Sequence, residues 1–298
     1  MDAVALLQAG SAAFLNLGFT WLVGSWLARR WVPAGIAPAH WLISLRRADI
    51  AALLLTLAAS TAALWAASAV KAGVALADAG AMFRLMLTTT DHGHASCAAI
   101  AILFLLLGVR WPGKGGRLTE TLTLMLLLAF AATRASMGHA GEGGWWRAPH
   151  LAETAHLVAI AVWTGAVLVS GWHALRPANV GMLPRAAMVQ YLDRMSQAAT
   201  VAVIVIAATG ITSGWHRVGS GANLLHTWYG YTLLAKVALV LAAIALGGWN
   251  KFFGLPAAAR SAAGIAIVRR VLRIEAVLLL AVLVAAACLT VQPPPAAI

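Results

Sequence analysis

Eight runs of apolar residues, each close to the length that crosses a lipid bilayer, constrain this chain more than any other feature. They cover about 5–28, 48–70, 94–109, 118–136, 150–173, 198–215, 228–249 and 271–291. Backbone amides inside lipid must be hydrogen-bonded within the protein, and runs rich in Ala, Leu and Val achieve this as helices. Only 10% of the residues are charged, against about 25% in soluble domains. We therefore predict an all-α polytopic membrane protein, a bundle of about eight transmembrane helices.

Alternate connections between these runs carry most of the chain's 21 lysines and arginines. The basic connections are 29–47, 110–117, 176–194 and 251–273. Because positively charged loops stay in the cytoplasm, we expect the N- and C-termini on the periplasmic side. This orientation accounts for the net charge of +12, so the lipid bilayer is an expected partner and nucleic acid is not. We expect a single membrane domain, 1–298, with four-helix halves at 1–140 and 150–292.

The predicted topology gathers histidines at the outer surface. Seven of the nine lie there: His92, His94, His139, His150, His156, His216 and His226. Three of them fall in segment 137–156, together with a methionine, two acids and four glycines. This segment is the densest cluster of metal-capable side chains in the chain, and it lies between the fourth and fifth apolar runs.

The residue types at this surface predict a metal site. His94 and Cys97 are three residues apart, so a helix places them on one face. Imidazole, thiolate and thioether groups together favour copper over hard cations, although zinc accepts the same donors. We expect ligands at His94, Cys97, His139 and His156, with His150 and Met137 assisting. The alternatives are interfacial histidines bonded to headgroups or carbonyls, and simple packing of Cys97.

Three further residues are expected to support these ligands. Glu153 is three residues from both His150 and His156, so it can orient an imidazole. His92 precedes the predicted ligand helix, and Trp163 lies two turns beyond His156 on the same face.

Polar residues within the apolar runs are costly and usually functional. The chain has three notable examples, Lys236, Asn250 and Glu275. The long stem of Lys236 can reach toward the membrane surface, which is the simpler explanation for that residue. Glu275 cannot reach as far, so we expect a partner such as Asn250, Arg273 or a basic group on a neighbouring helix. Coupling to a proton gradient through Glu153 or Glu275 is a further hypothesis.

Several segments of the C-terminal half are similar to one known family. They read HLVAIAVWTGAVLV at 156–169, RMSQAATVAVIVIAATG at 194–210, LLHTWYGYTLLAKVALV at 224–240, GGWN at 247–250 and RRVLRIEAVLLL at 269–280. Together they resemble the copper resistance D (CopD) family of inner-membrane proteins. The earlier runs match mostly in length and in the histidine after the fourth run.

The resemblance implies an eight-span copper permease in the bacterial inner membrane. Such a protein takes a copper ion, Cu(I) or Cu(II), from a periplasmic CopC-type copper-binding partner and passes it toward the cytoplasm. It also implies that Thr227, Tyr229, Lys236, Asn250 and Glu275 shape the helix core by packing and hydrogen bonding. A permease of this kind is not an enzyme.

Two other functions fit the same outer histidines. A helical bundle can hold haem b between two imidazoles, and His94 or His139 opposite His156 would suit an electron-transfer protein. Alternatively, the chain is a membrane module that binds a partner protein and no metal.

Overall fold

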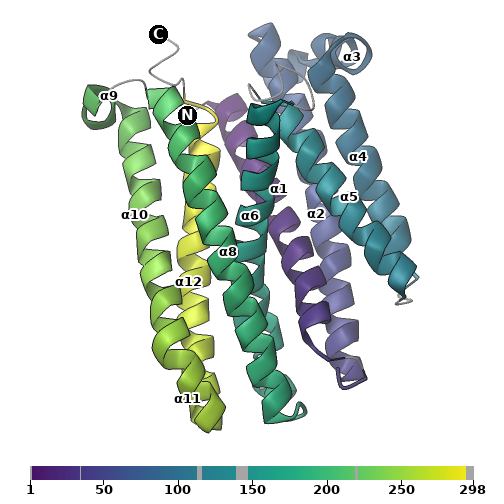
Figure 1. Cartoon of the computed structure of the whole chain (residues 1–298). Helices are drawn as coiled ribbons and strands as arrows, with labels where there is room; N and C mark the ends of the chain where they lie inside the picture. Colours follow the sequence, from purple (N-terminus) through teal and green to yellow (C-terminus); the bar gives the residue numbers. More distant parts are fainter. Residues whose placement is uncertain (1, 34, 113–115, 139–146, 219–220, 293–298) are drawn as a thin grey trace. The chain divides into compact units, whose positions relative to one another are not determined.

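The computed structural model describes residues 2–33, 35–112, 116–138, 147–218 and 221–292, without the side chains of 211–222. These residues form helices joined by short connections, and no strand occurs among them. Within these described ranges, eight helical segments are long and apolar enough to cross a membrane. The predicted all-α, eight-span membrane protein is therefore confirmed, and Figure 1 shows its long helices.

The membrane-spanning helices are α1 (Ala3–Trp31), α2 (Ala39–Ala72), α4 (Asp91–Arg110), α5 (Arg117–Ser136), α6 (Ala148–Val169), α8 (Arg185–Val218), α10 (Trp228–Trp249) and α12 (Ala262–Leu289). Two of them continue into π-helical turns, η3 (Ser170–Ala174) after α6 and η4 (Asn250–Gly254) after α10. The shorter elements are η1 (Leu76–Asp78), α3 (Gly80–Thr89), α7 (Pro177–Val180), α9 (Gly221–His226) and α11 (Leu255–Arg260).

Two helices begin well before the apolar runs that predicted them. Helix α2 starts at Ala39 instead of residue 48, and α8 starts at Arg185 instead of residue 198. Arginine is a good helix former, so the hydrogen-bonded helix continues through charged residues where hydropathy has already fallen. Hydropathy therefore marks the apolar part of each span and not the full helix.

Contacts divide the chain into two compact units. Unit 1 holds residues 1–19, 50–158 and 287–293, and unit 2 holds residues 20–49, 159–286 and 294–298. The boundary between the units falls within four helices, so that each has one part in unit 1 and the other in unit 2: α1, α2, α6 and α12. The division into the halves 1–140 and 150–292 stays a prediction.

In unit 1, the core forms where α4 packs along α5. Helix α4 buries a stripe at three- and four-residue spacing, namely Gly93, Ser96, Ala99, Leu103 and Leu106. Its start is fixed by Thr90, whose side chain accepts a hydrogen bond from the amide of Gly93 at 3.0 Å. An ion pair of 3.3 Å between Arg110 and Glu120 ties α4 to α5 at the other end.

In unit 2, α1 and α6 approach each other at a pair of glycines. A Cβ atom on Gly165 would overlap the carbonyl oxygen of Thr20 and lie 2.8 Å from the amide nitrogen of Gly24. Small residues allow such close contact between membrane helices. Helix α12 joins this core through Arg273, whose Nε donates to the carbonyl of Gly171 at 3.1 Å.

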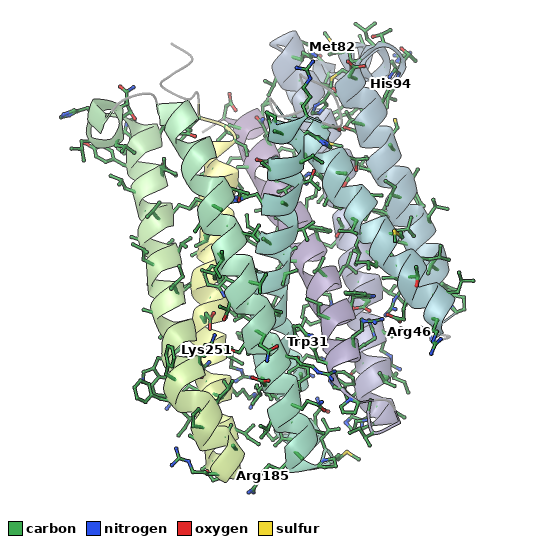
Figure 2. The ribbon with its side chains drawn as sticks, viewed as in Figure 1. Trp31, Arg46, Met82, His94, Arg185 and Lys251 are labelled. Carbon is green, nitrogen blue, oxygen red and sulfur yellow. The ribbon has the colours of Figure 1, made fainter. Side chains whose placement is uncertain are left out.

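Basic side chains lie toward one end of unit 2. Figure 2 shows Arg46, Arg185 and Lys251 in the lower part of that unit. This arrangement agrees with the alternating charge of the connections. The side of the membrane that this end faces stays a prediction.

Candidate functional site

Two of the predicted outer histidines lie against the C-terminal end of α5 in unit 1. His92, at the start of α4, places Nδ1 3.4 Å from the carbonyl oxygen of Met137. His150, in the first turn of α6, places Nε2 3.0 Å from the carbonyl oxygen of Ala132 and is 2% exposed. Since a helix rises about 1.5 Å per residue, these two carbonyls, five residues apart, lie about 7.5 Å apart along α5. Helices α4 and α6 therefore each place an imidazole against the last turns of α5.

These contacts define which ring nitrogen of each neutral histidine carries the proton. A carbonyl oxygen only accepts, so the proton lies on Nδ1 of His92 and on Nε2 of His150. The lone pair of His92 is then on Nε2. Histidines that bind metals in proteins are commonly oriented by such a bond from the other ring nitrogen. The carbonyls at a helix C-terminus also favour a nearby cation.

The thioether of Met137 lies on the same side of α4 as His92. Its sulfur is 3.9 Å from the Ser96 hydroxyl, which also bonds the carbonyl of His92 at 2.8 Å. His92 and Ser96 are four residues apart and so share a helix face. The nitrogen-donor side chain of His92 and the sulfur-donor side chain of Met137 therefore both lie at this end of unit 1.

His94 and Cys97 lie elsewhere on α4. Both are exposed, while the buried stripe of α4 includes Gly93 and Ser96. The structure therefore does not bring this pair to Met137, and their role as ligands stays a prediction. Figure 2 labels His94 at the same end of the helix. His139 lies outside the described residues.

The remaining predicted residues of this end follow along α6. Glu153 lies close enough to Arg134 on α5 for an electrostatic interaction, and Arg134 also donates to Asn16 at 3.4 Å. His156 is half-buried one turn further on. Within the described part of the chain, no three histidine, cysteine or acidic side chains are grouped to hold an ion. A complete site therefore needs Met137 or a residue outside this part, such as His139.

The structure corrects the partner expected for Glu275 in unit 2. Trp163 donates from Nε1 to Oε1 of Glu275 at 2.9 Å, and both side chains are buried. Arg273 instead bonds Gly171 and stacks on Trp172, with its guanidinium carbon 4.9 Å from the ring centroid. Lys236 is half-buried on α10. Trp163 therefore contacts an acid, a role that its spacing from His156 did not indicate.

Sequence reasoning missed a buried polar network in unit 2. Asp49 forms an ion pair with Arg29 and accepts from Trp21 Nε1 at 3.2 Å. His173, in the π-helical turn η3, lies 3.2 Å from the Ser44 hydroxyl. The network ties α1, α2 and η3 together. Its one sequence signal was an acid at residue 49, inside the second apolar run.

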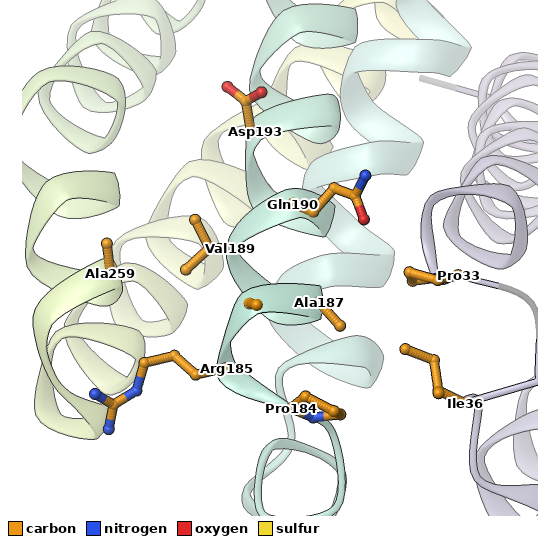
Figure 3. A pocket seen from close by; sticks show the side chains of 10 residues that line it. Pro33, Ile36, Pro184, Arg185, Ala187, Val189, Gln190, Asp193 and Ala259 are labelled. Carbon is orange, nitrogen blue, oxygen red and sulfur yellow. The ribbon is translucent and has the colours of Figure 1, made fainter.

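A groove of about 900 Å³ lies at the start of α8 in unit 2 (Figure 3). It is lined mainly by apolar side chains, with polar groups from Arg185, Gln190 and Asp193. None of the predicted copper ligands lines it.

Comparison with known proteins finds one family that is similar to the C-terminal third of the chain. The family model for copper resistance protein D matches residues 189–289. This segment is similar to the copper resistance D family. The match contains Lys236, Asn250 and Glu275 and confirms the resemblance, while the quoted segment 156–169 precedes it. No curated protein and no solved structure matches the chain. The chain thus has eight apolar helices long enough to cross a membrane among its described residues, and its segment 189–289 is similar to a copper resistance family.

Proposed function

We propose that this protein is a copper-binding permease of the inner membrane that moves copper from the periplasm toward the cytoplasm. The observation that carries the proposal is that His92 contacts the backbone of Met137 while the Met137 thioether lies against Ser96 of the same helix, with His150 bonded to Ala132 further along α5. The family match to residues 189–289 supports copper as the metal. Copper is the cargo in this proposal, and the protein is a carrier and not an enzyme.

The donor atoms suit this cargo. The imidazole of His92 and the thioether of Met137 lie on one side of α4, and imidazole with thioether favours copper over magnesium or calcium. His150, His156 and His139 are proposed to complete or extend the site. His94 and Cys97, on the exposed face, are proposed to receive copper first from a periplasmic CopC-type partner.

Replacing Met137 by leucine is expected to weaken Cu(I) binding at least about tenfold, because leucine keeps the volume and lacks the sulfur donor. A competition titration with a coloured Cu(I) chelator measures the affinity. Met125→Leu, an exposed methionine of the same helix, is the matched control and should bind like wild type. Equal Cu(I) affinity in Met137→Leu and wild type would remove Met137 from the site.

Transport itself is tested by copper uptake into proteoliposomes. Wild-type protein should accumulate copper inside the vesicles, and the double variant His92→Ala/Met137→Leu should lose most of this uptake. The two proteins are compared at equal reconstituted amounts. Uptake that is the same with the variant, or with vesicles lacking protein, would contradict the permease.

A further inference from the structure

Glu275 is a carboxyl group in the middle of the membrane-spanning helix α12, and it is 2% exposed. Among the described residues it accepts a hydrogen bond from the neutral indole of Trp163, at 2.9 Å. Across the described residues no basic side chain forms an ion pair with it. By contrast, Asp49 and Glu120 pair with arginines, and Glu153 interacts with Arg134.

This environment favours the neutral form of the acid. An ionised carboxylate removed from water is costly unless a cation or several donors compensate it. A single indole N–H supplies one hydrogen bond and no charge. Acids within membrane spans commonly mark proton or ion pathways for this reason. The structure thereby distinguishes Glu275 from Glu153, which has a cationic neighbour.

The carboxyl of Glu275 lies against the backbone of α10 at Gly247, which has no side chain. A Cβ on Gly247 would lie 3.2 Å from Oε1 of Glu275, and one on Gly254 would lie 3.0 Å from Val268. Gly254 comes seven residues after Gly247, whereas its neighbour Val268 comes seven residues before Glu275. The stretch from α10 to η4 therefore runs antiparallel to α12. Asn250, three residues after Gly247, therefore lies about 4.5 Å further along the helix axis.

Asn250 is a second unusual polar group on this path. It is 3% exposed, and neither its side-chain oxygen nor its nitrogen has a hydrogen-bond partner among the described residues. It opens the π-helical turn η4, a rare element that is frequent at functional sites. Buried polar atoms of this kind are usually satisfied by water or a ligand.

Several charged and titratable groups of unit 2 lie on the same elements as Glu275 and its neighbours. They are Arg269, Arg270 and Arg273 on α12, Lys236 on α10, Lys251 on η4 and His173 on η3. Arg273 bonds Gly171, and Lys251 donates to Thr200 at 3.0 Å. Lys236 is eleven residues from Gly247, which is about 16 Å along a helix.

We propose that Glu275 is the proton-binding site of this membrane domain. We also propose that Asn250 is the next polar side chain along the same proton path. The carboxylate takes up one proton to become a neutral acid and later releases it, with no other bond formed or broken. The inference rests on the proposed permease for its role, which is to couple copper movement to proton movement. The protonation itself is independent of that role.

Infrared spectroscopy of the protein in lipid tests the protonation directly. Wild type should show the C=O stretch of a protonated carboxylic acid that disappears in Glu275→Gln. Glutamine keeps the shape and can still accept from Trp163 Nε1. Glu153→Gln is the matched control and should retain the band, and Trp163→Phe should shift it because a hydrogen bond is lost. A spectrum without this band near neutral pH, or one unchanged in Glu275→Gln, would overturn the proposal.

Proteoliposome uptake with an imposed pH gradient tests the coupling. Wild-type copper uptake should depend on the gradient, while Glu275→Gln should bind copper like wild type and lose that dependence. An unchanged dependence in Glu275→Gln would overturn the coupling. If wild type takes up no copper, the permease fails, whereas the infrared band still decides whether Glu275 binds a proton.

Discussion

Replacing Gly165 by alanine is expected to destabilise the protein strongly, by several kcal/mol where overpacking alone costs about 1–3 kcal/mol. The added methyl would overlap the carbonyl oxygen of Thr20 and approach the amide nitrogen of Gly24 at 2.8 Å. Both neighbours are backbone atoms, which cannot rotate away, so α1 and α6 would have to separate. Thermal unfolding in detergent, followed by intrinsic tryptophan fluorescence, measures the loss.

A matched substitution on another helix controls for the general effect of alanine. Gly108 of α4 has no atom within 4 Å of the position that a Cβ would take. Gly108→Ala should leave the unfolding temperature unchanged or raise it, since alanine favours helix by up to about 1 kcal/mol over glycine. A Gly165→Ala protein as stable as Gly108→Ala would show that α1 and α6 do not meet at these glycines.

Replacing His92 by alanine is expected to weaken copper binding at least about tenfold, because the variant loses a ring nitrogen oriented by the carbonyl of Met137. His94→Ala on the same helix is the sharpest comparison, since His94 is exposed and two residues away. The spacing of the sequence favours His94, whereas our proposal uses His92. Affinities from the same chelator competition decide between them, and a loss in His94→Ala alone would move the site to the exposed face.

The fold could be predicted from the sequence because membrane helices are determined locally. Each apolar run satisfies its own backbone, so the count of eight needed no knowledge of tertiary contacts. The ends of α2 and α8 could not be predicted in the same way. Charged residues such as Arg46 and Arg194 lower hydropathy without ending a helix.

The candidate site was only partly predictable, because the face of a helix that is buried depends on contacts between residues distant in the sequence. Spacing placed His94 and Cys97 on one face, but which face of α4 is buried depends on its packing against α5. The bond from Trp163 to Glu275 joins residues 112 positions apart. No periodicity in either helix could have indicated it.

The most direct measurement of the central claim is the copper content of the purified protein, recorded together with its visible spectrum. Wild type is compared with His92→Ala/Met137→Leu, after size-exclusion chromatography has shown both to be monodisperse. We expect near-stoichiometric copper in wild type, no Soret band, and loss of copper in the variant. A Soret band that the variant lacks would show that the outer histidines hold haem, and equal copper in both proteins would show that the metal binds elsewhere.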